Sequence, residues 1–316
     1  MADVLIEGIL RKGHKMLISG PSKAGKSFFL MELAVALANG QKWIGFQCKK
    51  SRVLYINFEI DSASCIHRFM DIRAALKEHH GVTCDHNEDL MIWNLRGHAM
   101  PLNEMVPKIT AKCKDFNLDV ILVDPIYKVL MGDENNASDM GAFCNEFDKI
   151  ANLLHCSVIY CHHHSKGAQG FKKAMDRASG SGVFARDPDA QLDMLEIEPN
   201  EEYVDANTDT AWQIESSLRE FPNIIPKRIW FRYPLHEEET EGELKSQPVK
   251  DGGKGGRPSK IDDDKIEMYF DQYAVDGFAS TKDIANALEV HENSVRGYKS
   301  SKFEWVSRKG LKRVDG

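Results

Sequence analysis

The segment of residues 20–27, GPSKAGKS, combines two glycines, a lysine and a hydroxyl group at a characteristic spacing. It follows the apolar residues 16–18 and precedes the apolar residues 28–31. The glycines allow backbone N–H groups to turn inward around phosphate oxygens, and the positive N-terminal end of a following helix strengthens such binding. We therefore predict a nucleoside triphosphate site made by Gly20, Pro21, Ser22, Lys23, Ala24, Gly25, Lys26, Ser27 and Phe28.

Two side chains of this segment have distinct roles in the prediction. Lys26 would reach the β- and γ-phosphates of ATP, and the Ser27 hydroxyl would ligate Mg²⁺. The alternative is a glycine-rich turn between a strand and a helix that binds no ligand. The flanking apolar residues favour the phosphate site, because this loop pattern binds phosphate when a strand precedes it and a helix follows it.

Glu59 stands at the end of the apolar residues 53–58. Open α/β sheets bind their ligands at the carboxyl ends of the strands. A carboxylate there can accept a hydrogen bond from a water molecule and orient that water for attack on the γ-phosphate. The alternative role is that of a helix-capping acid, beside Asp61 and Ser62.

Asp124 ends a second apolar run, residues 120–123. An apolar strand that ends in aspartate has the Walker B form, in which the carboxylate holds Mg²⁺ through its water shell. Asp124 would do so opposite Ser27. The combination with the phosphate loop makes this prediction stronger than either motif alone.

Three histidines, His162, His163 and His164, follow the apolar residues 157–161. A histidine at this place can sense the γ-phosphate and signal its presence to the following loop. A zinc site shared with Cys156 and Cys161 is the competing interpretation. It is disfavoured, because neighbouring residues of a strand point to opposite faces and the three imidazoles cannot reach one ion without a bend.

Residues 172–189 mix Arg177 and Arg186 with a glycine and serine turn. A flexible basic loop beside a triphosphate site can donate an arginine to the nucleotide of a neighbouring subunit. A surface loop without such a role is the alternative. The spacing alone leaves both open.

The apolar runs that would position these groups alternate with helical patterns. Short, nearly continuous runs predict buried parallel strands at residues 17–19, 52–57, 90–94, 120–123 and 157–161. Helices are predicted at residues 28–39, 63–79, 102–115 and 138–154. Residues 191–197, 210–215 and 228–233 are expected to add antiparallel strands. Residues 1–235 therefore predict a doubly wound, mostly parallel α/β sheet with helices on both faces.

The composition changes after residue 235. Residues 236–260 contain almost no large apolar side chains and are predicted to be a flexible linker. Residues 261–316 recover helical periodicity and form a small second domain. Helices are predicted at residues 282–288, capped by Thr281, and 293–300, followed by a hairpin that turns at Gly310. This order resembles winged-helix DNA-binding domains, and a small helical bundle that does not bind DNA is the alternative.

Basic side chains gather in this second domain although the chain as a whole has a formal net charge of −7. A local excess of cations favours contact with the phosphates of DNA. The predicted contacts are Arg296, Lys299, Lys302, Arg308 and Lys309.

The overall composition restricts the class of protein. The negative net charge argues against a uniformly basic coat for nucleic acid. Seven cysteines without a C-x-x-C pair suit a reducing cytosol. The early charges of the N-terminus are atypical of a signal peptide, and no apolar run approaches the length of a membrane span. We expect a cytoplasmic protein that does not enter a membrane.

Read together, these stretches resemble the RecA-type P-loop ATPases, and most closely the plasmid-type hexameric replicative helicases of the RepA family. The resemblance covers roughly residues 5–233. It rests on GPSKAGKS, on VLYINFE followed by Ile66-His67-Arg68, on VILVDP, on CSVIYCHHHSKG and on the turn Gly180-Ser181.

The resemblance implies a RecA-like core, a ring assembly and ATP sites between subunits. It supports Lys26 and Ser27 on phosphate and Mg²⁺, Asp124 on Mg²⁺, and Glu59 as the catalytic carboxylate. It also implies His162 or His163 as the sensor of the γ-phosphate.

The family further places an arginine directly before its Gly-Ser turn, to act across the subunit interface. Ser179 stands at that place in this chain, so we favour Arg177, two residues earlier, over Arg186. The family's DNA-contacting loops line the hole of the ring, which implies Lys166, Lys172 and Lys173 as contacts with the strand.

These inferences predict an ATP-dependent DNA motor: a ring-shaped, homo-hexameric replicative helicase of a plasmid, phage or integrated element. Its partners would be single-stranded DNA in the ring, duplex DNA at the C-terminal domain, and a replication initiator or primase. The alternative is a RecA-type DNA-binding regulator or helicase loader that uses ATP as an assembly switch. Both need the same phosphate chemistry. A metabolic kinase fits less well, since no acceptor-binding lid is recognisable.

Overall fold

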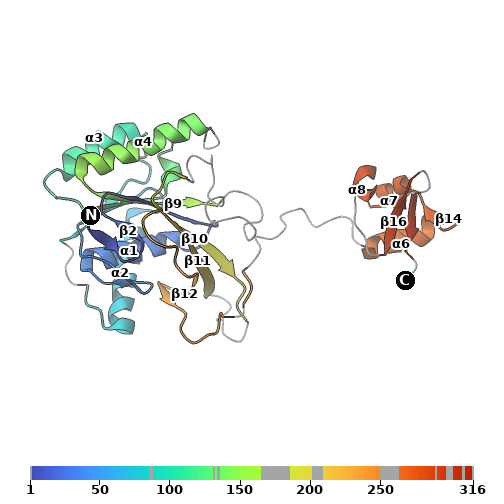
Figure 1. The fold of residues 1–316 in the computed structure, drawn as a ribbon, viewed down its shortest axis with the longest axis horizontal. Coiled ribbons are helices and arrows are strands. Elements are labelled where there is room, and N and C mark those ends of the chain that lie inside the picture. The colour runs from blue at the N-terminus through green and yellow to red at the C-terminus, as the bar shows by residue number, and fades with distance from the viewer. Residues whose placement is uncertain are drawn as a thin grey trace. The chain divides into compact units, whose positions relative to one another are not determined.

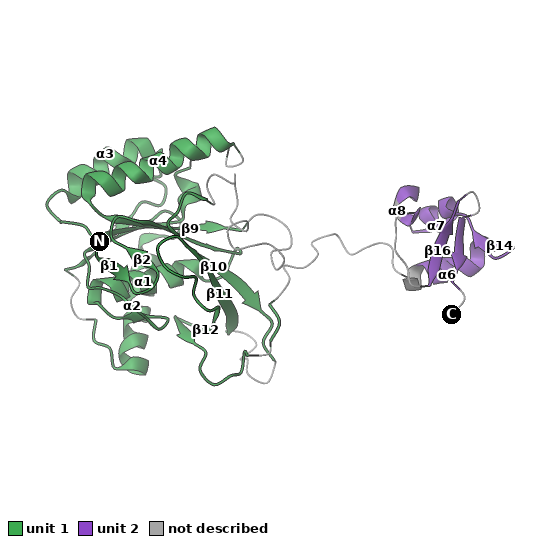
Figure 2. Ribbon diagram, viewed as in Figure 1, with its two compact units in different colours: residues 1–253 green, residues 254–316 purple. Residues whose placement is uncertain are grey.

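The computed structural model describes residues 2–84, 88–130, 132–133, 136–164, 186–200, 209–245, 247–249, 263–288, 290–296, 302–307 and 310–314. Contacts between Cα atoms divide the chain into two compact units, residues 1–253 and 254–316 (Figure 2).

The first unit is built on a large sheet, which has nine strands among the described residues, in the order β13-β12-β11-β10-β3-β9-β8-β6-β7. The strands from β10 to β7 in this order are parallel, and β11, β12 and β13 complete the sheet in antiparallel fashion. The bounds are β3 Lys15–Gly20, β6 Val53–Asn57, β7 Leu90–Asn94, β8 Val120–Asp124, β9 Ser157–His163, β10 Ala190–Ile197, β11 Thr210–Leu218, β12 Lys227–Arg232 and β13 Leu235–Glu238.

Helices cover both faces of this sheet (Figure 1). Helices α1 (Lys26–Asn39) and α2 (Ser62–His80) pack on one face, and α3 (Leu102–Cys113) and α4 (Ala137–Leu154) pack on the other. A short 3₁₀ helix, η1 (Ile126–Lys128), follows β8. Two small ribbons, β1 (Val4–Ile6) with β2 (Leu10–Arg11) and β4 (Lys42–Trp43) with β5 (Phe46–Gln47), complete the unit.

The predicted α/β fold, with its mostly parallel sheet, is confirmed. Helix α1 has buried side chains along nearly its whole length, because it is enclosed between the sheet and α2. One prediction was wrong in detail: β10 was expected to be antiparallel, but it pairs in parallel with β3 through residues 190–193. Its apolar pattern identified a strand and carried no information about which strand it would join.

The sheet also continues past residue 235, where the sequence places the start of the linker. Strand β13 runs to Glu238 and pairs with β12. Composition gave no sign of it, because His236, Glu237 and Glu238 are polar. His236 is nevertheless buried, and its backbone N–H and Nδ1 contact the Glu32 carboxylate of α1 at 3.0 and 2.6 Å.

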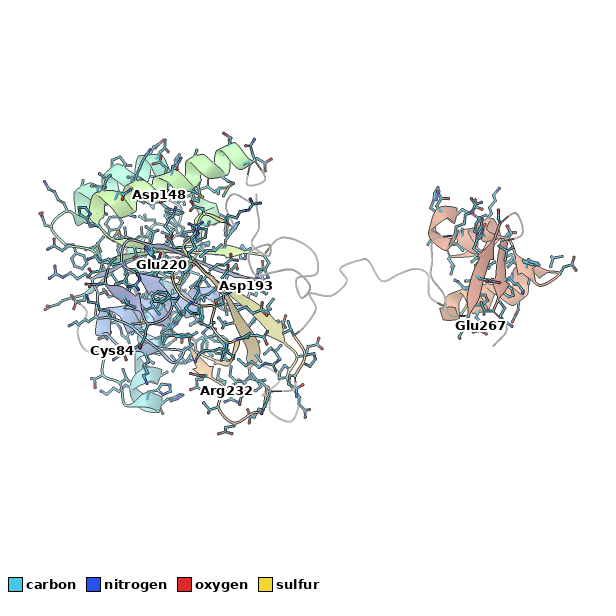
Figure 3. The ribbon with its side chains drawn as sticks, viewed as in Figure 1. Cys84, Asp148, Asp193, Glu220, Arg232 and Glu267 are labelled. Carbon is cyan, nitrogen blue, oxygen red and sulfur yellow. The ribbon has the colours of Figure 1, made fainter. Side chains whose placement is uncertain are left out.

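An ion-pair cluster ties the phosphate-loop strand to its neighbours. The buried Lys15 of β3 holds Asp148 of α4 (Figure 3) and Asp187, each at 2.7 Å. Burial lowers the pKa of Lys15, but the hydrogen bonds to both carboxylates outweigh it and raise the pKa. Lys15 therefore joins β3, α4 and the segment that precedes β10.

Replacing Lys15 with methionine is expected to lower the free energy of unfolding by about 1–2 kcal/mol, because two charge-assisted hydrogen bonds are lost. Urea denaturation measures this change. Lys49→Met is the matched control: its pair with Asp3 is exposed on both sides, so its loss should change stability much less than Lys15→Met does. Equal effects of the two substitutions would contradict the prediction.

The second unit contains α6 (Asp263–Tyr273), α7 (Thr281–Ala287) and α8 (Glu292–Arg296) with a small sheet. In the described part of this unit the sheet has the order β14-β15-β17-β16, with bounds Ala274–Val275, Phe278–Ala279, Gly310–Arg313 and Phe303–Val306. Its core includes Ile266, Phe270, Ile284, Val295 and Leu311.

The helix-turn-helix order and the hairpin of this unit are present, with two differences from the predictions. The cap of α7 is Ser280, whose side chain accepts from the backbone N–H of Asp283, whereas the Thr281 hydroxyl donates to Glu292. Ser280 and Thr281 both carry a hydroxyl that could cap the helix. The helix begins at Thr281, one residue earlier than predicted, so the cap is Ser280. Helix α8 is described only to Arg296, and residues 297–300 of the predicted helix lie outside the described residues.

The structure also bears on membranes. Among the helices that it describes, none is both long enough and apolar enough to cross a bilayer.

Candidate nucleotide-binding site

The glycine-rich loop connects the carboxyl end of β3 to the first turn of α1. Gly25 is the N-cap of α1 and has φ of 72°, a conformation that glycine adopts without strain. A Cβ atom at Gly20 would lie 3.1 Å from Cβ of Met194, and one at Gly25 would lie 3.3 Å from Nε2 of His236. The loop is therefore packed tightly from behind, and a side chain at either position would require its neighbours to shift.

Lys26 spans this loop from the first position of α1. Its ammonium group donates to the carbonyl oxygens of Gly20 and Pro21 at 2.9 and 2.6 Å, and to Nδ1 of His163 at 3.1 Å. Burial lowers the pKa of Lys26, and the nearby carboxylates of Asp124 and Glu59 act in the opposite direction. The cation is thus held at the mouth of the loop, within the field of both predicted acidic residues.

Asp124 is the last residue of β8 and is buried. Its Oδ2 accepts a hydrogen bond from the Tyr55 hydroxyl at 2.5 Å, and its Oδ1 accepts one from the Cys161 thiol at 3.0 Å. Burial, followed by the Asp124 charge, raises the pKa of Tyr55 and of Cys161 well above their ordinary values.

Glu59 follows β6 at the same edge of the sheet and is exposed. Its backbone N–H is fixed by Oδ1 of Asn57 at 3.1 Å. The capping alternative does not hold for Glu59, because the N-cap of α2 is Asp61, which accepts from the backbone N–H of Ser64 at 3.0 Å. Burial and then the Glu59 charge raise the pKa of Tyr127, which places this carboxylate beside η1.

The three consecutive histidines have different surroundings. His163 contacts Lys26, and its ring lies 5.6 Å from that of Tyr127. His164 contacts the buried Asp193 of β10 at 2.6 Å, and Asp193 also accepts from the Ser19 hydroxyl (Figure 3). His162 is buried and directly precedes His163 in sequence, so it lies on the opposite face of β9 from His163. His163 is therefore the histidine that reaches the phosphate loop.

The structure describes only part of the remaining predicted site. Arg177, Lys166, Lys172, Lys173, Lys299, Arg308 and Lys309 lie outside the described residues. Arg186 is exposed, and its carbonyl oxygen accepts from the Arg219 guanidinium. In the second unit, Arg296 pairs with Glu292 at 2.6 Å and Lys302 pairs with Glu267 at 2.9 Å.

One feature beside the loop was missed from the sequence: an aromatic surface next to Ser27. The ring of Phe28 lies 5.4 Å from Phe231 and 5.3 Å from Tyr233, and the Arg68 guanidinium lies 4.8 Å over Phe28. Tyr233 is 57% exposed and donates to Asp71 of α2 at 2.6 Å. The residues of this surface come from segments that are far apart in the sequence, among them α1, α2 and the β12–β13 turn, and they become neighbours only in the folded protein. Arg68 was noticed as part of a motif, but nothing local marked Tyr233.

The residues present fit ATP and Mg²⁺. Gly25 has no side chain that would cap the first-turn N–H groups of α1, and the Lys26 ammonium stands beside them. The Ser27 hydroxyl and the Asp124 carboxylate are hard oxygen donors, of the type that Mg²⁺ prefers. Among the described His, Cys, Asp and Glu side chains, no group of three is arranged to hold a metal ion by itself.

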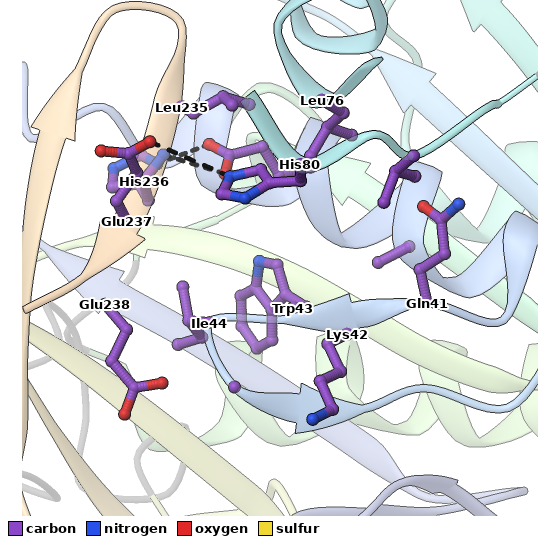
Figure 4. Close-up of a pocket in the computed structure, with 14 residues that line it drawn as sticks. Gln41, Lys42, Trp43, Ile44, Leu76, His80, Leu235, His236, Glu237 and Glu238 are labelled. Carbon is purple, nitrogen blue, oxygen red and sulfur yellow. Dashed lines mark hydrogen bonds and ion pairs between the residues drawn. The ribbon is translucent and has the colours of Figure 1, made fainter. Parts of the chain in front are cut away.

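A cavity of about 430 Å³ lies elsewhere, beside α1 (Figure 4). Its described walls include Trp43, His80, Glu237 and the buried pair Glu32–His236, and they do not include Lys26, Glu59, Asp124 or His163. Burial raises the pKa of Glu32, while the adjacent His236 acts against that shift. The pair braces β13 against α1 directly behind Gly25.

Comparison with known proteins identifies the fold and the family. A search of curated proteins found no match. Among 492 matching chains of solved structures, one titled "ATPase Domain of G40P" has a TM-score of 0.52 and 15% sequence identity, covering 72% of this chain and 86% of that chain. This likeness shows a shared RecA-like P-loop fold. A protein-family model described as "AAA domain" matches residues 2–169, more than half of the chain. With its phosphate loop and Walker B strand in place, the chain belongs to this AAA domain family.

Proposed function

We propose that this protein is an ATP-dependent DNA motor: a ring-shaped replicative helicase of a plasmid, phage or integrated mobile element. It hydrolyses ATP at subunit interfaces and moves along single-stranded DNA. The observation that carries the proposal is the meeting of Lys26, Glu59, Asp124 and His163 at one edge of the sheet. This set supplies a phosphate cation, a water-orienting carboxylate, a metal-binding carboxylate and a γ-phosphate sensor.

Each residue has a separate task in hydrolysis. Lys26 neutralises charge on the β- and γ-phosphates, which it reaches from its present place over the loop. Glu59 accepts a hydrogen bond from the attacking water and takes its proton as the water oxygen bonds to the γ-phosphorus and the bond to the β–γ bridging oxygen breaks, which releases ADP and phosphate. When bound, Mg²⁺ supplies charge neutralisation between the phosphates, and Ser27 and Asp124 are the residues that would hold it.

His163 connects hydrolysis to movement in this proposal. Its Nδ1 now accepts from Lys26. When Lys26 turns to a γ-phosphate, this contact is released or shared, and β9 leads directly into residues 165–185, where the sequence places Arg177, Lys166, Lys172 and Lys173. We assign Arg177 as the arginine that acts across the subunit interface and the three lysines as contacts with single-stranded DNA.

The domain organisation follows from this assignment. The ATPase core predicted for residues 1–235 extends through β13 to Glu238, the linker lies within residues 239–260, and residues 261–316 bind DNA as a winged helix. We propose a homo-hexamer in the cytoplasm, with a replication initiator or primase as partner. Arg296 and Lys302 would exchange their present carboxylate partners for DNA phosphates.

The aromatic surface is assigned to the base of the nucleotide. Tyr233→Ala is expected to weaken the affinity for ATP about fivefold, because a stacked aromatic pair contributes about 1 kcal/mol. Tyr233→Phe is the matched control, since it keeps the ring and removes only the hydroxyl that donates to Asp71. A fluorescent ATP analogue measures both affinities. Equal losses in the two variants would contradict the assignment to stacking.

Strand displacement on a forked DNA duplex tests the motor itself. The wild-type protein should separate the strands with ATP and Mg²⁺ and fail with a non-hydrolysable analogue. ATP-dependent DNA binding without strand separation would instead favour the regulator or loader. That alternative is supported by the separate C-terminal unit with its helix-turn-helix order.

A further inference from the structure

Asp124 receives one hydrogen bond on each of its carboxylate oxygens, from two side chains that have no predicted contact with nucleotide or Mg²⁺. The Tyr55 hydroxyl lies 2.5 Å from Oδ2, and the Cys161 thiol lies 3.0 Å from Oδ1. All three residues are nearly inaccessible to solvent, with exposed fractions of 0%, 1% and 3% for Tyr55, Cys161 and Asp124. A buried carboxylate with a donor on each oxygen has a single orientation.

The sheet places these side chains together. Asp124 of β8 pairs with Asn57 of β6, and Tyr55 precedes Asn57 by two residues, so Tyr55 lies on the same face as Asp124. On the other side, Val123 of β8 pairs with Tyr160 of β9, so the next residue, Cys161, flanks Asp124. This is the face that α1 covers, where Lys26 begins the helix.

The tyrosine donor is itself fixed from outside the sheet. The ring of Phe69, from α2, meets the ring of Tyr55 edge-on at a centroid distance of 5.1 Å. Phe69 is buried, and α2 packs on α1. The position of the Tyr55 hydroxyl is therefore determined by the packing of α2, and through it the orientation of Asp124.

We propose that Tyr55 and Cys161 are positioning residues for the metal-binding carboxylate, which they hold from both sides. This inference rests on the proposed function, because it assigns Asp124 to Mg²⁺. With one donor already on each oxygen, Asp124 is held as an acceptor, and in this orientation it would hold Mg²⁺ through the water shell of the ion. The affinity for the metal in the nucleotide complex then depends on two side chains that do not touch nucleotide.

The test measures metal and nucleotide affinity separately from turnover. Tyr55→Phe removes only the hydroxyl. We expect about a 10-fold loss of Mn²⁺ affinity in the complex with an ATP analogue, and electron paramagnetic resonance measures this affinity. Affinity for a fluorescent ATP analogue in EDTA should stay unchanged, since the phosphate loop is intact. The matched control is Tyr160→Phe, which alters a buried tyrosine on the opposite face, stacked on Phe147.

Cys161 provides a second, independent pair of variants. Cys161→Ala removes a donor and should lower Mn²⁺ affinity by less than Tyr55→Phe, because a thiol is a weak donor. Cys161→Ser restores a donor and should recover most of that loss. This pair keeps the proposal testable if Tyr55→Phe does not fold.

The outcomes separate the inference from the proposed function. Mn²⁺ affinity of Tyr55→Phe equal to that of Tyr160→Phe would overturn the positioning role. A loss of analogue affinity in EDTA as large as the loss of Mn²⁺ affinity would also overturn it. If the wild-type protein itself shows no gain in nucleotide affinity with Mg²⁺, the proposed function fails. A loss confined to metal affinity, with recovery in Cys161→Ser, would establish the inference.

Discussion

Lys26→Met is expected to weaken the affinity for ATP about 100-fold or more and to abolish turnover. The Lys26 ammonium is the buried cation at the mouth of the loop, within reach of the carbonyl oxygens of Gly20 and Pro21 and of His163. Loss of one partner from a desolvated charge pair costs about 2–5 kcal/mol, which corresponds to this range of affinity. Equilibrium titration with a fluorescent ATP analogue measures the loss.

Lys23→Met is the matched control for this substitution. Lys23 belongs to the same predicted site through the backbone of the loop, which the substitution keeps, but its side chain is exposed, and its φ of 65° places it at a turn. Its replacement should change nucleotide affinity less than about threefold, the level of an exposed ion pair. If both variants lose affinity to the same extent, the loop binds phosphate through general positive charge, and the specific role of Lys26 is wrong.

Glu59→Gln is expected to keep nucleotide affinity within about twofold and to lower ATP turnover about 100- to 1000-fold, the range for loss of a general base. The amide retains the size and exposure of the side chain and cannot take a proton from water. Glu59 lies in the field of Lys26 and beside Tyr127, so the substitution acts where hydrolysis would occur. Phosphate release and analogue binding, measured on one preparation, separate the two effects.

Asp61→Asn serves as the control, because it neutralises an exposed carboxylate two residues away. Asp61 caps α2 through its contact with Ser64. Asparagine is also a good cap, so stability and turnover should both stay close to wild type. Normal turnover in Glu59→Gln, or an equal loss in Asp61→Asn, would remove Glu59 from the catalytic step.

Local sequence was sufficient for the parts of the site that lie next to one another in the chain. The loop of residues 20–27 needs only a strand, two glycines and a helix, and these are contiguous. Glu59 and Asp124 were predicted to lie at the same edge of the sheet for a related reason. Each ends or follows a buried strand, and parallel strands bring their carboxyl ends to a common edge.

Contacts between distant segments could not be predicted in this way. The choice of His163 over His162 depends on the register of β9 against β3, which no periodicity reveals. Tyr233 reaches Phe28 only because β12 and β13 fold back on α1. Residues 236–238 of β13 were taken for linker, because the buried residue among them, His236, is polar and is paired with Glu32. Composition measures only the average polarity of a segment. Here a single partner, Glu32, allows the polar His236 to be buried.

Steady-state phosphate release by the wild-type protein, with and without single-stranded DNA, tests the central claim most directly. A motor that moves DNA with the energy of ATP should turn over ATP several-fold faster when the oligonucleotide is added, and Lys26→Met should be inactive in both conditions. A rate of ATP turnover that does not change when the oligonucleotide is added, or that is retained in Lys26→Met, would contradict the account.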